Sequence, residues 1–289
     1  MVGKKITDEN FMRSTQRPFA LFAAATLTLL GLCRLEAEVI VAEEFPNNTR
    51  TAQAPPVSLQ WYASNAAGTT VADRAIALTK GGEKMQAIWA GFPSVSLEVG
   101  DRLVFSCHMR AEEKVGLVNS GVMVSLLAAQ GEIGGEESEP KVMCAGYRLQ
   151  LGNSQHTRSG QPFTVMAFDE RKDAENRSPM LTSHSGYKRI ATAGPTGRVP
   201  YEPLEIYRIE FSIERATESD LLISAAVEGG SFTEAHTLAH QTSGTDDSIT
   251  TTFDTLGLTI NGATDRGGFP HVTFSDLKLE VLRAGATTP

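Results

Sequence analysis

Residues 102–110 read RLVFSCHMR, and apart from Val104 apolar and polar side chains alternate along this run. Leu103, Phe105, Cys107 and Met109 fall on one face, and the polar residues between them fall on the other. A period of two is the repeat of a β-strand with one buried and one wetter face. Such strands are typical of antiparallel sheets, so this stretch predicts an antiparallel β fold.

The same alternation extends over most of the chain after residue 38. It is clear in residues 147–151 (YRLQL) and 207–214 (YRIEFSIE). Further strands are expected at 38–45, 75–79, 85–92, 94–99, 122–128, 163–168, 221–228, 253–260 and 272–282. In the last of these the apolar parity slips between Phe274 and Leu277, which predicts a β-bulge near Ser275–Asp276.

Helices contribute little to this pattern. No stretch of 12 or more residues shows a helical apolar stripe, and only short helical turns are expected, in 170–176. About a dozen strands without helices predict an all-β, two-sheet antiparallel jelly-roll sandwich. Residues 131–141, 169–203 and 234–252 are polar and are expected to be loops. A loop as long as the second is uncommon unless it is functional.

The N-terminus has the features of a secretory signal peptide. Residues 18–33 carry no charge, four basic residues precede them, and a small residue, Ala37, follows. We therefore expect a signal peptide at 1–37 and a single β-sandwich domain at 38–289. The apolar run is short for a membrane span, although an uncleaved signal anchor remains an alternative, as does lipidation at Cys33. The expected location is secreted, periplasmic or at the cell surface, with no transmembrane span in the mature chain.

The charge balance limits the partners. The full chain of 289 residues has a net charge of −8, and removal of residues 1–37 would make it −10. A nucleic-acid-binding role therefore gets no electrostatic support. The two cysteines of the mature chain, Cys107 and Cys144, could pair in an oxidising compartment, but two buried free thiols are the favoured reading.

Several short motifs resemble a known group of domains. Glu43-Glu44-Phe45 ends the first strand, Trp61-Tyr62 follows, and residues 95–103 read VSLEVGDRL. The C-terminal part contains TFDTLGL at 252–258 and VTFSDLKL at 272–279. This layout resembles the concanavalin A-like and LamG-like jelly rolls and the carbohydrate-binding modules of secreted bacterial proteins. Those domains often have a VGD turn before a core strand. The resemblance spans nearly all of the mature chain and implies a fold more than a function.

The resemblance directs attention to polar residues that could bind a sugar. His108 and Arg110 share the polar parity of one strand, and Arg148 and Gln150 share that of another. These four residues are the predicted polar binding face, on which a lyase could neutralise a uronate and abstract its proton. Carboxylates at glycosidase spacing are not evident, since Glu205 and Glu210 have opposite parity. No catalytic residue is therefore assigned.

Aromatic side chains and carboxylates supply the remaining candidates. Sugar rings stack on aromatic platforms, for which Trp61 and Tyr62 are candidates, together with Tyr187 and Tyr201, expected to be exposed in the long loop. Jelly-roll modules of this kind often hold a structural calcium near the first and last strands, so Glu43, Glu44 and Asp276 are its candidate ligands. No other cofactor is required.

Together these features predict a secreted, non-catalytic β-sandwich protein that binds a polysaccharide or a cell-surface glycan. A polysaccharide lyase or glycoside hydrolase on the same fold is the first alternative. A structural or adhesive protein of the cell envelope is the second.

Overall fold

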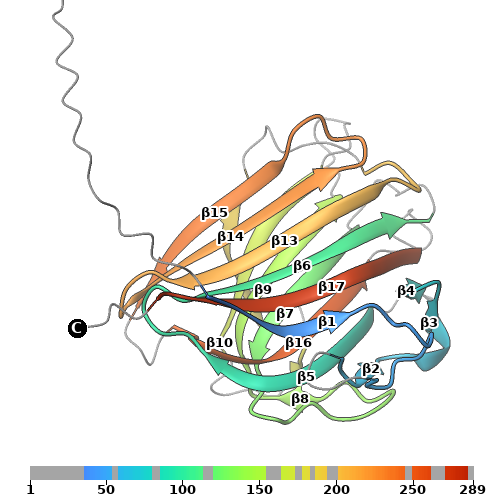
Figure 1. The fold of residues 1–289 in the computed structure, drawn as a ribbon, viewed down its shortest axis with the longest axis horizontal. Helices are drawn as coiled ribbons and strands as arrows, with labels where there is room; N and C mark the ends of the chain where they lie inside the picture. The colour runs from blue at the N-terminus through green and yellow to red at the C-terminus, as the bar shows by residue number, and fades with distance from the viewer. Residues whose placement is uncertain are drawn as a thin grey trace, which may run out of the picture. The chain divides into compact units, whose positions relative to one another are not determined.

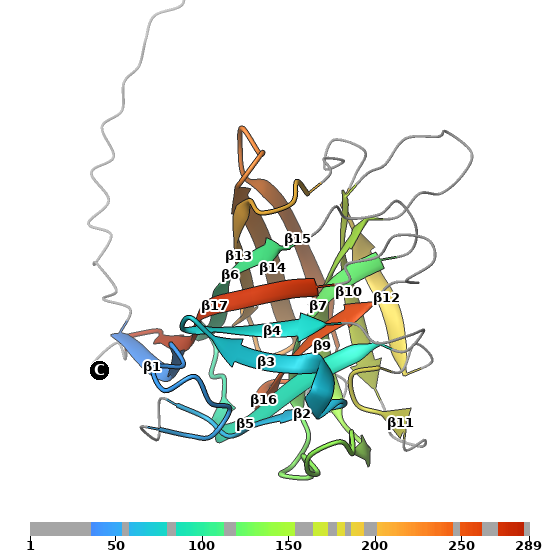
Figure 2. The same ribbon diagram turned by 90° about the vertical axis from the view of Figure 1, so that its right-hand side faces the viewer.

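In a computed structural model of the chain, the alternating stretches form β-strands. The structure describes residues 36–53, 58–79, 85–112, 120–153, 164–172, 178–182, 186–193, 201–244, 249–261 and 271–285. The strands pair antiparallel into two large sheets, which form the two layers of a sandwich (Figures 1 and 2). The predicted all-β sandwich is confirmed. The expected signal peptide, residues 1–37, lies almost wholly outside the described residues. Among the described residues, no helix is long and apolar enough to cross a membrane.

The eight-stranded sheet has the order β15-β14-β13-β6-β17-β4-β3, and β1 pairs with β17 beside this path. Its strands are β1 (Glu36–Glu43), β3 (Thr69–Ala72), β4 (Ala75–Thr79), β6 (Arg102–Ala111), β13 (Ile206–Arg215), β14 (Asp220–Gly229), β15 (His236–Ser243) and β17 (His271–Arg283).

The seven-stranded sheet has the order β12-β10-β9-β7-β16-β5-β2. Its strands are β2 (Trp61–Ala63), β5 (Gln86–Ser96), β7 (Ser120–Ala128), β9 (Ala145–Asn153), β10 (Thr164–Lys172), β12 (Tyr187–Thr192) and β16 (Thr252–Asn261). A small pair, β8 (Lys141–Val142) with β11 (Ser178–Pro179), and a 3-10 turn, η1 (Ala66–Gly68), complete the described elements.

The main core lies between the two large sheets. The apolar parity of β6 points inward, with Phe105 and Met109 fully buried, and Tyr147 and Leu149 of β9 face it from the other sheet. Burying one such side chain contributes about 1.5–3 kcal/mol, so the alternation determines which face of each strand is covered. Cys107 lies in this core, whereas Cys144 lies in a second apolar cluster. Both thiols are buried and neither forms a disulfide bond, as favoured from the sequence.

The slip of parity in the last strand is a β-bulge, as predicted. The pairing of β17 with β6 shifts register between Ser275 and Lys278, so that two residues, Asp276 and Leu277, lie opposite one. Asp276 takes a left-handed backbone conformation, with φ of 51°. Because of the extra residue, Leu277 and Leu279 return to the core after Phe274 while Asp276 stays outside.

Three expectations about strands and loops were wrong. One strand, β5, which ends at Ser96, replaces the two expected at 85–92 and 94–99, because a register shift against β16 accommodates Pro93, which has no N–H for the ladder. The expected loop 169–203 contains the end of β10 and the strands β11 and β12, and the expected loop 234–252 contains β15. Both β12 and β15 are edge strands of polar sequence, so they lack the strong apolar alternation by which buried strands are recognised.

The VGD turn before β6 has a structural role in closing the sandwich. Asp101 is buried and accepts hydrogen bonds from Arg283 Nη1 (2.6 Å), Ala284 N (3.0 Å) and Glu98 N (3.1 Å), so it joins the β5–β6 turn to the end of β17. Burial alone would raise the pKa of Asp101. These hydrogen bonds outweigh burial and hold the pKa below its ordinary value.

This network predicts an acid-dependent loss of stability. Because the pKa of Asp101 is lowered by folding, its contribution is fully present above the ordinary aspartate pKa of about 3.9 and is lost as the pH falls through the lowered value. Asp101→Asn should therefore lower the free energy of unfolding at pH 7. Urea titrations of both proteins from pH 7 to pH 2 should show the difference shrinking below about pH 4. A constant difference over this range would contradict the assignment.

Candidate functional site

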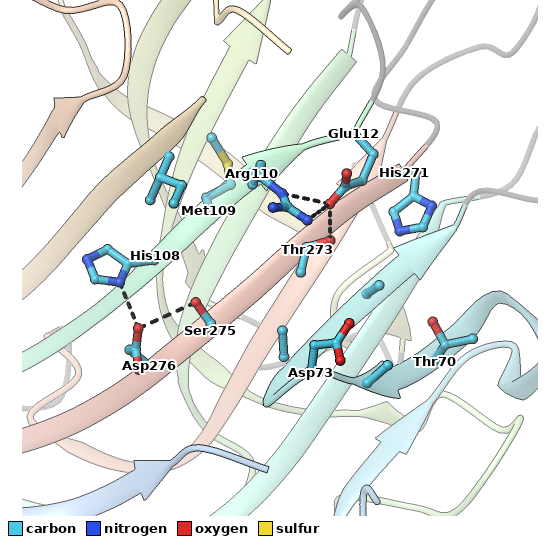
Figure 3. A pocket seen from close by; sticks show the side chains of 14 residues that line it. Thr70, Asp73, His108, Met109, Arg110, Glu112, His271, Thr273, Ser275 and Asp276 are labelled. Atoms are coloured by element: carbon cyan, nitrogen blue, oxygen red, sulfur yellow. Dashed lines mark hydrogen bonds and ion pairs between the residues drawn. The ribbon is translucent and has the colours of Figure 1, made fainter. Parts of the chain in front are cut away.

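A hollow of about 610 Å³ lies on the outer face of the eight-stranded sheet. Strands β3, β4, β6 and β17 form its floor and walls, and Figure 3 shows the side chains that line it. The outward parity of β6 supplies His108 and Arg110, and that of β17 supplies Thr273 and Ser275. Ile206, 55% exposed, adds an apolar contact at the rim. The hollow therefore gathers polar side chains from strands far apart in the sequence.

One hydrogen-bonded pair of side chains in the hollow depends on the bulge of β17. His108 Nδ1 lies 2.8 Å from Asp276 Oδ2, and the hydroxyl of Ser275 lies 3.5 Å from the same oxygen (Figure 3). The bulge and the left-handed backbone of Asp276 turn its carboxylate toward His108 on the neighbouring strand. Bulges often re-aim a side chain in this way next to functional sites. The carboxylate orients the imidazole and remains partly open to solvent.

An ion pair lies at the end of β6, next to β17. Arg110 donates from Nε (2.8 Å) and Nη2 (2.6 Å) to Glu112 Oε1, which also accepts a hydrogen bond from the Thr273 hydroxyl at 2.8 Å. Partial burial would raise the pKa of Glu112. Hydrogen bonds from Arg110 and Thr273 outweigh the effect of burial and lower the pKa of Glu112. Electrostatic attraction to Arg110 and His271 lowers it further. Glu112 is therefore an ionised acceptor at neutral pH.

A third carboxylate, Asp73, stands at the opposite wall of the hollow (Figure 3). It is in the two-residue turn between β3 and β4, where Asp73 (φ 51°) and Arg74 (φ 61°) both have left-handed backbone. An ion pair from Arg74 to Glu44 and a hydrogen bond from Arg74 N to Asn48 (3.5 Å) connect this turn to the segment after β1. These contacts therefore hold the turn from which the exposed Asp73 side chain projects at the rim.

The four predicted polar residues do not share one face. His108 and Arg110 lie in the hollow on β6, but Arg148 and Gln150 lie on the outer face of the other sheet, on β9. The prediction of a single face was wrong because a period of two assigns each strand a polar side and leaves its sheet undetermined. Asp276, predicted as a calcium ligand, joins His108 and Arg110 in the hollow instead.

Arg148 belongs to a buried ionic row across the seven-stranded sheet. It is 3% exposed and donates from Nε (3.1 Å) and Nη2 (2.7 Å) to Asp169, which also pairs with Arg189. The ring of Tyr187 lies over the Arg148 guanidinium, 3.7 Å away, and burial raises the pKa of Tyr187. Gln150 accepts a hydrogen bond from Arg189 Nη2 at 2.7 Å and stays partly open to solvent.

The aromatic candidates have different surroundings from those expected. Trp61 is fully buried in the core beside Phe45, so it is not an exposed platform. Tyr62 is half-buried and stacks on Trp89, with ring centroids 6.3 Å apart. Tyr201 was expected to be exposed and is instead 2% exposed, because its ring packs edge-on against Tyr207 in the core. The position of Tyr201 in a long polar connection between strands predicted exposure and did not reveal this packing.

The three candidate calcium ligands have separate partners. Glu43 is buried and accepts hydrogen bonds from the Ser58 hydroxyl (2.9 Å), Phe45 N (3.1 Å) and Leu59 N (3.2 Å). Glu44 pairs with Arg74, and Asp276 pairs with His108. Within the described part of the chain, no group of three or more His, Cys, Asp or Glu side chains could hold a metal ion. In this part of the chain, Glu43, Glu44 and Asp276 are therefore not gathered into one metal site.

Sequence reasoning did not assign the other polar residues of the hollow to a site: Thr70, Asp73, Glu112, His271, Thr273 and Ser275. The alternate spacing of Arg110 and Glu112 was a signal for that pair, since both side chains leave the strand on one side. Asp73 comes from the turn between β3 and β4, and His271 and Thr273 come from β17, so only the sheet order reveals that they are neighbours.

Comparisons with known proteins agree on the fold. No family model matches the sequence, and no curated protein matches it. A variant of the Emp46p carbohydrate recognition domain is similar, with a TM-score of 0.52 and 11% identity, over 86% of this chain and 98% of that chain. The Emp47p carbohydrate recognition domain has a TM-score of 0.50 and 12% identity, over 85% and 95%. The concanavalin A-like jelly roll suggested by the sequence motifs is confirmed.

Proposed function

We propose that this chain is a secreted, non-catalytic carbohydrate-binding protein whose ligand site is the hollow of the eight-stranded sheet. The observation that carries the proposal is the placement of a hydrogen-bonded pair, His108–Asp276, and an ion pair, Arg110–Glu112, side by side in one open depression. Paired donors and acceptors of this kind suit vicinal hydroxyl groups, each of which can donate and accept a hydrogen bond.

The chemistry of the hollow favours binding over hydrolysis. A glycosidase needs one carboxyl group that stays protonated, with a raised pKa, to act as the general acid. Hydrogen bonds from Arg110 and Thr273 instead lower the pKa of Glu112. An ionised Glu112 and an Arg110 side chain fixed against it can hold a sugar by hydrogen bonds without reacting with it.

Two further features support the proposal. The similar solved structures are described as carbohydrate recognition domains, which makes a sugar ligand the first class to test. The basic residues, the uncharged stretch 18–33 and Ala37 support a cleaved signal peptide at 1–37 and a mature domain at 38–289, located outside the cytoplasm or at the cell surface. Cleavage is checked by N-terminal sequencing of the exported protein.

Arg110→Gln should weaken glycan binding about ten- to a hundredfold, since a lost hydrogen bond to a charged group costs about 1.5–3 kcal/mol. A glycan array with the wild-type domain first identifies the ligand, and calorimetry with the best ligand then compares the variants. Arg102→Gln is the matched control, because Arg102 lies on the same strand, also pairs with a glutamate and is not in the hollow.

Two results would overturn this assignment. The folded wild-type domain could bind no polysaccharide on the array, which would remove the sugar ligand. Alternatively, Arg110→Gln and Arg102→Gln could weaken binding equally, which would place the site outside the hollow. Accumulation of an unsaturated product absorbing in the ultraviolet would show that the protein is a lyase.

A further inference from the structure

The charges that line the hollow do not balance. With histidine counted as neutral, the lining residues carry one positive charge against three negative charges, on Arg110, Asp73, Glu112 and Asp276. Beside the hollow, on the same outer face, three cations each pair with a different glutamate: Arg102 with Glu210, Arg208 with Glu228 and Lys278 with Glu280. The hollow is therefore a local excess of negative charge on a face where neighbouring charges compensate one another.

The excess lies on two of the three carboxylates. Arg110 neutralises Glu112 in their ion pair. Asp276 is hydrogen-bonded to His108 and lies 3.5 Å from the hydroxyl of Ser275, and neither partner brings a positive charge while the imidazole is neutral. Among the residues that the structure describes, none forms an ion pair or a hydrogen bond with the carboxylate of Asp73. Asp73 and Asp276 are therefore the two carboxylates without a counter-charge.

The strand pairing brings these two carboxylates to the same end of the hollow. Strand β17 pairs with β4 up to Ser275, which lies opposite Ala75, and it pairs with β1 from Leu277 onward. Asp276 is the bulged residue at this change of partner, and the turn that carries Asp73 leads directly into Ala75. Figure 3 shows both side chains on the side of the hollow away from Glu112. A cationic group bound at this end would be attracted by both carboxylates.

The floor between the two ends is made of small apolar side chains. Ala75 and Ala77 of β4 line the hollow and lie opposite Ser275 and Thr273 of β17. Methyl groups suit the apolar C–H face of a sugar ring, which gains by leaving water. At about 3.4 Å per residue, the three residues from Thr273 to Asp276 separate the two ends by about 10 Å, the length of about two sugar rings.

We propose that the ligand of the hollow is an amino-sugar polysaccharide with free ammonium groups, one of which binds between Asp73 and Asp276. The inference rests on the proposed function, because it names the class of glycan that the same site takes. An ammonium group donates three hydrogen bonds and supplies the charge that the two carboxylates lack. A uronate or a sulfated glycan would instead place a further negative charge beside them, which is strongly unfavourable.

A lysine side chain of another protein would bring the same charge but would fit the rest of the hollow less well. It has no ring to cover Ala75 and Ala77, and it has no hydroxyl groups for the Arg110–Glu112 pair at the other end. A sugar with one ammonium group meets all three parts of the hollow at once. The observations therefore favour a glycan over a basic protein segment.

Asp73 is the residue that would distinguish charged from neutral sugars. Its carboxylate is exposed and has no partner to lose, whereas Asp276 also orients His108. Asp73→Asn removes the charge and keeps the size of the side chain. Asparagine also adopts the left-handed backbone of this position, where φ is 51°, so the turn should keep its conformation.

Calorimetry with the exported protein compares tetramers of β-1,4-linked glucosamine, N-acetylglucosamine and glucose, which differ only at carbon 2, in a buffer that keeps the amines protonated. The wild type should bind the glucosamine tetramer about tenfold more tightly than the other two. Asp73→Asn should remove this preference and leave the affinity for the two neutral tetramers unchanged. Glu98→Gln is the matched control, since it removes the same charge from an exposed turn at the opposite end of β6 and should keep the preference.

Salt tests the ionic contact without any substitution. Raising the ionic strength from about 0.01 M to about 1 M shortens the Debye length from about 30 Å to about 3 Å. Binding of the glucosamine tetramer should weaken over this range, and binding of the neutral tetramers should not. A capped tetralysine, which carries the same four ammonium groups, measures the general attraction of a chain of net charge −8 for cations and should bind about tenfold more weakly than the glucosamine tetramer.

The results separate this inference from the proposed function. Neutral glycans that bind at least as tightly as the glucosamine tetramer would reject the ammonium site and keep the sugar site. Equal effects of Asp73→Asn and Glu98→Gln, or tetralysine binding as tight as that of the glucosamine tetramer, would also overturn it. If the folded wild type binds no glycan, both proposals fail. Circular dichroism verifies that each variant is folded, and the salt series on the wild type decides the question if Asp73→Asn is not.

Discussion

Asp169→Ala is expected to destabilise the protein by about 3–5 kcal/mol, because it leaves a buried guanidinium without its counter-charge. Arg148 is 3% exposed, and two of its nitrogens donate to Asp169. Arg189 of β12 pairs with the same carboxylate, so removal of the Asp169 carboxylate leaves two cations, one on each strand beside β10. The Tyr187 ring above Arg148 limits the access of water that could replace the carboxylate.

Urea unfolding at pH 7 measures this loss, and two variants test its cause. Glu228→Ala removes a carboxylate from an ion pair with Arg208 that is about half exposed on both sides, and it should cost less than about 1 kcal/mol. In the double variant Arg148→Met/Asp169→Leu, apolar side chains replace both charges and should recover part of the stability. A loss below about 1 kcal/mol for Asp169→Ala would mean that water reaches Arg148.

The polar side of each strand was predictable, but its neighbours were not. The alternation in 102–110 and 147–151 correctly places His108 and Arg148 away from the core. It contains no information about which strand pairs with which, because pairing joins residues that are far apart in the chain. His108 therefore meets Asp276 across the bulge, and Arg148 meets Asp169 on the other sheet. The slip of apolar parity in β17 did reveal the bulge itself.

Residue type was a poorer guide to exposure than alternation. Tyr201 lies in a long polar stretch and yet packs against Tyr207. Burial of its large apolar ring is favourable even though the side chain ends in a hydroxyl. Arg148 and Asp169 are buried although both types are usually exposed. Each depends on the other for its counter-charge, and a single sequence does not show such a pair when its members lie on different strands.

Gly146→Ala is expected to destabilise the protein by about 3 kcal/mol or more, through backbone strain and overpacking together. Gly146 on β9 has φ of 145°, which a residue with a side chain rarely adopts. A Cβ there would lie 2.3 Å from the carbonyl oxygen of Leu126 and 2.9 Å from Cα of Leu127, both backbone atoms of the paired strand β7. Neither backbone atom can move out of the way unless β7 shifts away from β9. This shift would occur next to the buried Arg148 of β9.

Two other glycines separate the strain from the clash. Gly131 has φ of 77°, and an added Cβ there would meet nothing within 4 Å, so Gly131→Ala should cost only about 1–2 kcal/mol. Gly135 has open space and no positive φ, so Gly135→Ala should be neutral or stabilising by about 0.4–1 kcal/mol. Urea unfolding of the three variants should therefore rank them Gly146, Gly131, Gly135 in order of decreasing loss. Equal losses for Gly146→Ala and Gly131→Ala would mean that β7 yields freely, because only the conformational strain would then remain.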